Sequence, residues 1–395
     1  MINPYYGEFG ISPIPLELSL NYCSHKCAYC FANLNSPDRK ANLVSITNLL
    51  NDFENRKTLV ASLLQRRYPI LISNKVDPFA ATNYKLAVPL FKILHALEIP
   101  VAIQTKGGDG IEESLPFIRP SAWYISLATL DDGIRKRIEP GAPSVEERLT
   151  LAGELVRAGH HVSFGVNPIV REWLPEPSEL FARLRAVGVK DVWIETLHLN
   201  NNQTRNMSAK ELAAIGPAVI KRAMKLRADD DTYGYFVETI QTARAMGMET
   251  FCISNPSPSK YWEPYKRMYP DRFPIFQDFV NWCWETKHVG DPVFFDEWWD
   301  TAKANIPQGM AASVTDYIGA TTPHVKVDRK VDKQMSFRDL LAVHWQEPRC
   351  KLFPFKNQSF DETTEEYQGR IVVAEDKNRL PVFKFMGRPL NKDRG

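Results

Sequence analysis

Short apolar runs alternate with longer stretches of helical spacing along the first half of the chain. The runs predict six β-strands, at Leu16–Leu20, Ile70–Ser73, Val101–Gln104, Trp123–Leu127, His161–Val166 and Val192–Thr196. Apolar residues three or four positions apart predict a helix through Leu86, Leu90, Leu94 and Leu97, where Pro89 indicates a late start or a kink. Six strand and helix units in sequence predict an α/β fold with a parallel sheet and right-handed crossovers.

The helix after the fourth strand has the clearest limits. Ser144, followed three residues later by Glu147, has the pattern of a capping box. Gly159 is typical of a residue that ends a helix. Between them, apolar residues supply a face that can pack on the sheet, namely Leu149, Leu151, Leu155 and Val156.

The alternation fades after about residue 200. Residues 208–226 and 231–247 have helical spacing, and 249–254 has the composition of a late strand before Pro256 and Pro258. Thirteen aromatic residues then stand between Tyr261 and Trp299. They are able to stack on nucleobases or to pack against the preceding domain, and the lack of interleaved basic runs favours packing. We therefore divide the chain into a barrel domain at 1–255 and an aromatic-rich extension at 256–395, for which binding of substrate or DNA remains open.

Composition limits the setting of the protein. The chain has 395 residues, 44% of them hydrophobic, and a formal net charge of +2, which is far from a nucleic-acid-binding signature. No apolar stretch reaches the length of a membrane span, and the first residues lack the features of a signal peptide. Six cysteines are too few for a disulfide framework in a chain of this length. We expect a cytoplasmic protein, in the host cytoplasm if the source is viral, with no membrane partner.

The chemistry is concentrated in one cysteine motif. Cys23, Cys27 and Cys30 follow the first predicted strand with the spacing Cys-x₃-Cys-x₂-Cys. Three thiolates on a short loop can bind three irons of a [4Fe–4S] cluster and leave the fourth iron open. The alternatives are a partial zinc site or inert thiols, but structural zinc has four ligands and only His25, inside the loop, is near enough in sequence to be the fourth.

This motif, with the aromatic Tyr29 before its third cysteine, resembles that of the radical S-adenosylmethionine (SAM) superfamily. The resemblance implies a partial (β/α)₆ TIM-type barrel, a [4Fe–4S] cluster, and SAM bound at the open iron. It implies reductive cleavage of SAM to a 5′-deoxyadenosyl radical, with electrons from an external one-electron reductant of the flavodoxin or ferredoxin type. In such enzymes the protein positions the groups and the cofactors react.

A narrower resemblance, across roughly residues 12–200, is to the spore photoproduct lyase branch, also called DNA-repair photolyase-like. It is carried by five segments and Arg148: Ser-Asn-Lys-Val-Asp-Pro-Phe (73–79), Ile-Pro-Val-Ala-Ile-Gln-Thr-Lys (99–106), Tyr-Ile-Ser-Leu-Ala-Thr-Leu (124–130), Ile-Glu-Pro-Gly-Ala-Pro-Ser (138–144) and Gly-Val-Asn-Pro-Ile (165–169). The resemblance implies that Ser73, Lys106 and Ser126 contact SAM. It also implies that Tyr29 flanks the adenine and that the strand end from Val166 to Pro168 lines the adenine pocket.

Three further residues match positions of the same branch. Glu139 and Arg148 are expected to form a structural ion pair, whereas Asp77 is expected to face either the substrate or a backbone amide. Two departures concern hydrogen transfer. Spore photoproduct lyase has a hydrogen-donating cysteine and a relay tyrosine where this chain has about Leu71 and Phe31. Neither side chain has a weak X–H bond to give, so the product radical would recover its hydrogen from 5′-deoxyadenosine.

We therefore expect hydrogen abstraction from a thymidine-derived base, in DNA or as a modified nucleotide, with Phe31 and Asp77 near the substrate. The preferred reaction is an isomerisation of the glycyl-thymidine type, from nitrogen to carbon linkage, as in relatives from viral thymidine-hypermodification pathways. A base inside a duplex would have to be flipped out to react.

Three alternatives remain. One is DNA repair of the spore photoproduct lyase type, with Cys252 as a substitute hydrogen donor. Another is a peptide-modifying radical SAM enzyme, with an auxiliary cluster on Cys252, Cys283 and Cys350. The third is a non-catalytic iron–sulfur protein that binds nucleic acid, which the SAM-contacting positions disfavour.

Overall fold

The computed structural model describes most of the first 252 residues and short pieces beyond them. The described residues are 2–4, 14, 16–20, 22–32, 43–56, 59–65, 67–72, 75–225, 230–252, 261, 264–265, 267–268, 288, 291–293, 371–375 and 381–385. Ser73, Cys283, Cys350, Trp298 and Trp299 lie outside them. Of the extension, only the short pieces between 261 and 385 are described, so the division at residue 255 stays a prediction.

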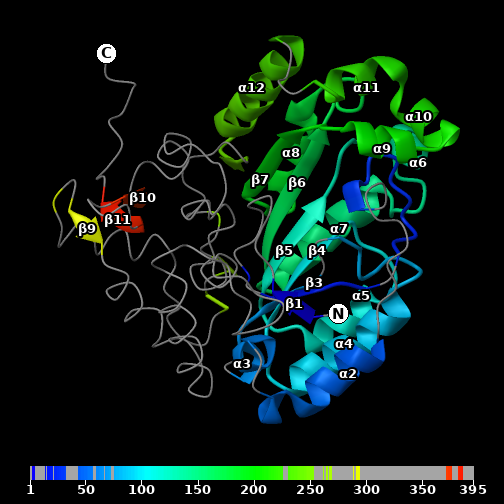
Figure 1. Ribbon diagram of the computed structural model, residues 1–395. Helices are drawn as coiled ribbons and strands as arrows, with labels where there is room; N and C mark the ends of the chain where they lie inside the picture. The colour runs from blue at the N-terminus through cyan, green and yellow to red at the C-terminus, as the bar shows by residue number, and fades with distance from the viewer. Residues whose placement is uncertain are drawn as a thin grey trace.

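An eight-stranded sheet with strand order β1 to β8 forms the centre of the fold (Figure 1). The edge strand β1 is antiparallel to β2, and every other neighbouring pair is parallel. The strands are β1 (Ile2–Pro4), β2 (Leu16–Leu18), β3 (Ile70–Ile72), β4 (Val101–Thr105), β5 (Ala122–Ser126), β6 (His161–Ile169), β7 (Asp191–Thr196) and β8 (Glu249–Phe251). The seven parallel strands form an open, partial TIM-type barrel. The expected fold class is confirmed. β8 is the late strand expected within 249–254, and the edge strand β1 is additional to the expected strands.

Helices connect the strands and cover the outer face of the sheet. They are α2 (Leu43–Asp52), α3 (Leu59–Gln65), α4 (Tyr84–Ala96), α5 (Ile111–Ser114), α6 (Asp132–Ile138), α7 (Val145–Arg157), α8 (Pro177–Ala186), α9 (Asn201–Asn206), α10 (Ala209–Ile215), α11 (Pro217–Ala223) and α12 (Asp230–Ala245), with short 3₁₀ turns at Phe53–Asn55 and Leu115–Phe117. In the part of the chain that the structure describes, no helix is both long and apolar enough to cross a bilayer.

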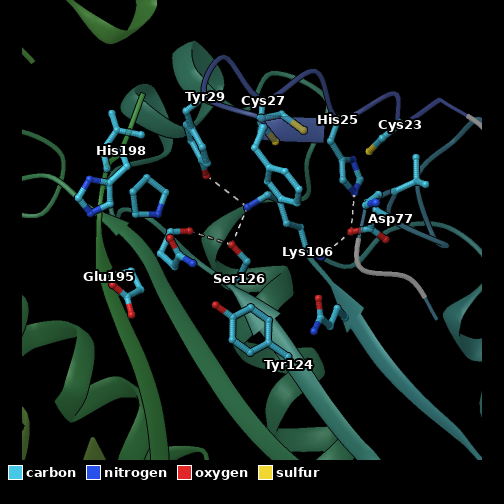
Figure 2. A pocket seen from close by; sticks show the side chains of 18 of the residues that line it. Cys23, His25, Cys27, Tyr29, Asp77, Lys106, Tyr124, Ser126, Glu195 and His198 are labelled. Carbon is cyan, nitrogen blue, oxygen red and sulfur yellow. Dashed lines mark hydrogen bonds and ion pairs between the residues drawn. The ribbon is translucent and has the colours of Figure 1, made fainter. Parts of the chain in front are cut away.

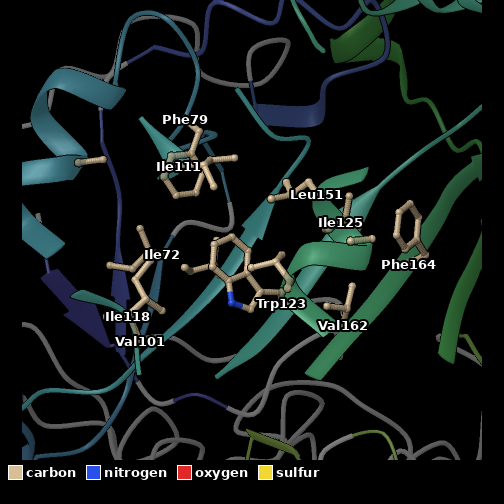
Figure 3. Close-up of a cluster of buried hydrophobic side chains, with 14 of the residues drawn as sticks. Ile72, Phe79, Val101, Ile111, Ile118, Trp123, Ile125, Leu151, Val162 and Phe164 are labelled. Carbon is tan, nitrogen blue, oxygen red and sulfur yellow. The ribbon is translucent and has the colours of Figure 1, made fainter. Parts of the chain in front are cut away.

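Alternation along each strand separates an outer core from the barrel interior. On β5, Trp123 and Ile125 point outward and join a large cluster with residues of α4 and α7 (Figure 3). Trp123 is fully buried there and stacks on Phe79, with ring centroids 6.1 Å apart. Side chains of this size contribute about 1.5–3 kcal/mol each when buried. Tyr124, between the two outward residues, belongs instead to a second, inner cluster.

The inner cluster fills the amino-terminal end of the barrel. It joins Leu71, Ala102 and Trp193 to Tyr261 and Tyr265 from the aromatic segment. The Tyr261 ring lies 4.9 Å from that of Trp193. For these two tyrosines the packing interpretation of the aromatic segment is therefore correct. Beyond them, β9 (Pro292–Val293), β10 (Ile371–Glu375) and β11 (Pro381–Phe385) form a separate three-stranded sheet in the order β10, β11, β9.

Helix limits follow local hydrogen bonding more than hydrophobic spacing. The capping box of α7 is confirmed, since the Ser144 hydroxyl accepts from the Glu147 N–H and the Glu147 carboxylate accepts from the Ser144 N–H at 2.7 Å. The late start expected at Pro89 is wrong, because α4 begins at Tyr84 and contains Pro89. The carbonyl of Asn83 already accepts hydrogen bonds from Leu86 and Ala87, so the first turn forms before the proline.

The region at 208–226, expected to be helical, contains two helices. Gly216, with a φ of +94°, separates α10 from α11. Pro217 then occupies the first position of α11, where a proline needs no hydrogen-bond partner.

Candidate active site

The cysteine motif lies on a loop at the carboxyl end of the barrel strands. Cys23, Cys27 and Cys30 all line a cavity of about 440 Å³, which also reaches the ends of β4 to β7 (Figure 2). Cavities of this size hold cofactors and small ligands. The carboxyl end of a barrel of this type is also where active sites gather.

Backbone contacts with the Glu-Pro-Gly segment hold the loop in place. The Ala28 N–H donates to the Ile138 carbonyl at 2.8 Å, and the Gly141 N–H donates to the His25 carbonyl at 2.9 Å. The loop approaches Gly141 so closely that a β-carbon there would lie 2.2 Å from the Ser24 carbonyl oxygen. No larger residue fits at Gly141 without displacing the Ser24 carbonyl, and the segment around Gly141 supports the cysteine loop.

His25 connects the same loop to Gly141 and to Asp77, the residue that follows β3. Its Nδ1 donates to the Gly141 carbonyl at 2.9 Å, and its Nε2 lies 3.1 Å from Oδ2 of Asp77. Burial alone would lower the pKa of His25, but the Asp77 carboxylate outweighs burial and raises it. Because both ring nitrogens are engaged, His25 is unsuited to the zinc-ligand role considered above.

Asp77 is a buried anchor. Its carboxylate accepts from the Phe79 N–H at 3.0 Å, the Thr105 hydroxyl at 2.8 Å and the Lys106 N–H at 2.5 Å. Burial opposes the charge, but His25 and these hydrogen bonds lower the pKa of Asp77. Asp77 thus faces backbone amides, one of the two environments expected for it, and also lines the cavity.

A buried charge network lies beside the cysteine loop. Glu139, fully buried, pairs with Arg148 at 2.5 Å and with Lys106 at 2.9 Å, and it accepts a hydrogen bond from the Tyr29 hydroxyl. Burial would raise the pKa of Glu139, yet the two cations hold it far below its ordinary value. The expected pair of Glu139 and Arg148 is present, and Lys106 joins it.

Lys106 is held on three sides. Besides Glu139, its ammonium donates to the Ser126 hydroxyl at 2.6 Å and lies 3.3 Å from the Tyr29 hydroxyl (Figure 2). An ammonium has three donors, so these contacts use all of them. Arg148 also contacts this group, because its guanidinium donates to the Ser126 carbonyl at 2.9 Å. Three residues expected to surround SAM therefore form one connected group.

The buried thiols would have to lose their protons to bind iron. Burial, with a smaller contribution from Asp77, raises the pKa of Cys23 to about 12, and burial raises that of Cys27 well above its usual value. Metal binding to such thiols releases the protons. Among the described residues, no three His, Cys, Asp or Glu side chains converge as ligands of one metal ion. A cubane cluster differs in binding each cysteine at a separate iron, and a motif with three cysteines on one cavity fits that requirement.

The expected site residues divide into three groups. Those lining the cavity are Tyr29, Phe31, Asp77, Lys106, Ser126 and Pro168, together with the three cysteines of the motif. Val166 does not line the cavity, because its side chain points away from the barrel interior and is fully buried in the outer core. The next residue, Asn167, lines the cavity beside Pro168. Cys252, just after β8, is not among the lining residues, and Ser73 lies outside the described part.

Sequence reasoning missed several polar residues of the cavity. Gln104, Tyr124 and Trp193 come from the inner faces of β4, β5 and β7, and Glu195 and His198 from the end of β7. Burial lowers the pKa of His198. For Gln104, Tyr124, Trp193 and Glu195 the signal was the strand alternation itself, since they share a face with Lys106 and Ser126. His198 lies beyond the end of β7, where alternation gives no signal.

Together, fold and cavity define an α/β protein with an open parallel barrel and a cysteine-lined site at its carboxyl end. A comparison with models of known protein families finds no match. Uncharacterized proteins of Mycobacterium tuberculosis and Mycobacterium bovis are 29% identical to the chain over 227 residues. The match spans 52% of this chain and 64% of each relative, so the chain covers less than two thirds of their length.

Several solved structures are similar to the chain over part of its length. Spore photoproduct lyase complexed with dinucleoside spore photoproduct is 16% identical, with a TM-score of 0.40 over 61% of this chain and 76% of the lyase. SuiB of Streptococcus suis, bound to its precursor peptide SuiA, is 15% identical, with a TM-score of 0.39 over 64% of this chain and 54% of SuiB. Methylornithine synthase (PylB) is 12% identical, with a TM-score of 0.35 over 69% of this chain and 82% of the synthase.

Proposed function

We propose that the chain is a radical SAM enzyme that abstracts hydrogen from a thymidine-derived base in DNA. The proposed reaction is an isomerisation of the glycyl-thymidine type. The observation that carries the proposal is that the three cysteines of one Cys-x₃-Cys-x₂-Cys loop line a single cavity with Tyr29, Lys106 and Ser126. When bound, a [4Fe–4S] cluster with SAM supplies a 5′-deoxyadenosyl radical able to abstract hydrogen from carbon.

The chain's own residues would hold and shield these groups. Cys23, Cys27 and Cys30 would bind three irons, and the buried ion pair of His25 and Asp77 would fix the loop that carries them. Lys106 lines the cavity with its side chain 14% exposed. Because its three donors are already used, the carboxylate of a ligand would share one of them with a present acceptor, such as Glu139. Tyr29, packed on Trp173, would provide an aromatic wall for an adenine.

The cavity wall supports a rearrangement over a reduction. Among the described residues that line it, no cysteine outside the motif is present, so a thiol hydrogen donor is lacking there. A product radical would then recover hydrogen from 5′-deoxyadenosine. The hydroxyl of Tyr124, which lines the same cavity, favours repair of the spore photoproduct lyase type as the second candidate, since a phenol can also give hydrogen.

Isotope labelling separates the two candidates. Deuterium at the abstracted position of the substrate should be recovered in the product or in SAM, and a reaction in D₂O should leave the product unlabelled, as measured by mass spectrometry of nucleosides. Solvent deuterium in the product would contradict the rearrangement. Phenol and thiol hydrogens exchange with water before transfer. If the Tyr124→Phe or the Cys252→Ser variant no longer placed solvent deuterium in the product, the substituted residue would be identified as the donor.

A further inference from the structure

Among the described residues that line the cavity, three carry a buried side-chain donor with no hydrogen-bond partner or ion pair. Within the part of the chain that the structure describes, the Gln104 amide nitrogen, the Tyr124 hydroxyl and the Trp193 indole nitrogen have no hydrogen-bond partner. All three residues line the cavity, and their exposed fractions are 8%, 6% and 1%. A buried donor without a partner costs about 1–3 kcal/mol, so three such groups on one cavity point to a ligand.

These donors form a layer below the group around Lys106. Each precedes by two residues a side chain at the carboxyl end of its strand: Gln104 precedes Lys106, Tyr124 precedes Ser126, and Trp193 precedes Glu195. Two residues of a parallel strand span roughly 6.6 Å. The layer is thus the floor of the cavity, deeper in the barrel than the cysteine loop.

Gly165 of β6 gives the floor its shape. It pairs with Trp193 on one side and with Ser126 on the other. A β-carbon at Gly165 would lie 1.9 Å from the Tyr124 hydroxyl oxygen. The missing side chain therefore lets the Tyr124 hydroxyl reach across β6 toward the strand of Trp193. We call Gln104, Tyr124 and Trp193 the donor floor.

We infer that the donor floor binds carbonyl oxygens of a pyrimidine base. An indole N–H can only donate, and an amide nitrogen also donates, so the complementary group is an acceptor. The three donors are uncharged, and the Glu195 carboxylate also lines the cavity, which disfavours a phosphate. A thymine ring carries two carbonyl oxygens. This inference rests on the proposed function and specifies how its substrate is held.

The protonation state of Tyr124 agrees with a donor role. Burial raises the pKa of Tyr124 far above its ordinary value, and the nearby Glu195 carboxylate raises it further. The Asn167 side chain acts against this shift, although no hydrogen bond of good geometry joins it to the Tyr124 hydroxyl. The phenol therefore keeps its proton at neutral pH.

The test measures binding of nucleosides to the full chain after anaerobic reconstitution with iron, sulfide and SAM. Equilibrium dialysis would compare thymidine with 2-thiothymidine and 4-thiothymidine, in which the weaker acceptor sulfur replaces one carbonyl oxygen. Tyr124→Phe and Gln104→Met should each lower thymidine affinity roughly threefold to tenfold, as expected for one lost neutral hydrogen bond. One of the two thio analogues lacks the carbonyl oxygen that the donor floor binds. For that analogue, the same two variants should change the affinity little, because the hydrogen bond is already absent. Tyr233→Phe, at an exposed position of α12, is the matched control and should leave affinity unchanged.

Other outcomes decide the inference as well. Equal thymidine affinity in wild type and both floor variants, with intact melting transitions, would overturn it. So would the absence of binding of any carbonyl probe to the wild type. A capped dipeptide amide serves as the probe for a peptide substrate. If the dipeptide binds with the same dependence on the floor and thymidine does not, the donor floor stands as a carbonyl site and the proposed nucleobase substrate fails.

Discussion

At the scale of single residues, Glu139 has the most consequential environment in the site. It is fully buried and forms ion pairs with two cations, Arg148 and Lys106. Glu139→Gln keeps the shape but leaves both cations without their carboxylate. We expect a loss of about 3–5 kcal/mol in the free energy of unfolding, measured by urea denaturation, because breaking a buried pair leaves uncompensated charge.

The matched control is the same substitution at an exposed ion pair on the surface. Glu146 pairs with Arg183, but its side chain is 71% exposed. Glu146→Gln should cost less than about 1 kcal/mol, since exposed ion pairs are screened by solvent. Similar losses in the two variants would show that the network around Glu139 has no special role in stability.

Gly141 supports a second prediction, because its role is purely spatial. A methyl group at this position would meet the Ser24 carbonyl at 2.2 Å and displace the cysteine loop. Gly141→Ala should therefore reduce the iron bound after reconstitution while the far-UV circular dichroism stays unchanged. Gly234→Ala, on α12 with nothing within 4 Å of the added carbon, should keep its iron. Full iron content in Gly141→Ala would refute the supporting role of the Glu-Pro-Gly segment.

The residues of the site were predictable to different degrees. The cysteine spacing predicts cluster chemistry, which stays a prediction, and the motif positions Tyr29, Lys106 and Ser126 do line the cavity. The links of Lys106 to Glu139 and of His25 to Asp77 join residues 33 and 52 positions apart, and no local pattern reports such pairings. Val166 was assigned to the cavity because the whole strand end from Val166 to Pro168 was assigned to it together. Successive side chains of a strand point to opposite faces, so not all of them can line the cavity.

At the scale of elements, the cap of α7 gives a direct test. Ser144 caps the helix that carries Arg148 toward Glu139. Ser144→Ala should cost about 1 kcal/mol of stability, because one N–H at the helix start loses its acceptor. The measurement is the urea midpoint at unchanged slope. An unchanged midpoint would mean that tertiary packing alone fixes the start of α7.

Elements with strong local signals were the ones predicted correctly. All six expected strands exist, because their apolar runs are buried between helices and the barrel interior. The failures occurred where another interaction prevailed. Hydrogen bonds to Asn83 start α4 ahead of Pro89, and Gly216 divides a region with continuous helical spacing. The edge strand β1 has only three residues, too few for a periodic pattern.

At the scale of the whole molecule, the parallel sheet brings distant segments to one end of the barrel. The cysteine loop follows β2, Asp77 follows β3, Lys106 follows β4 and Glu139 follows α6, yet they form one connected site. This convergence follows from topology, since the carboxyl ends of parallel strands share one edge. The order of strands along the sequence therefore predicts the edge of the sheet at which the candidate site lies, whereas the depth of the cavity and its donor floor follow only from the three-dimensional structure.

The central claim is that the loop from Cys23 to Cys30 binds a [4Fe–4S] cluster that acts with SAM. The most direct measurement is iron, acid-labile sulfide and 5′-deoxyadenosine formation in the anaerobically reconstituted protein with SAM and dithionite, compared with Cys27→Ala. The wild type should hold about four irons and four sulfides per chain and cleave SAM, and the variant should lose the cleavage. A wild type that holds zinc without labile sulfide, or a Cys27→Ala variant that cleaves SAM at the wild-type rate, would contradict the claim.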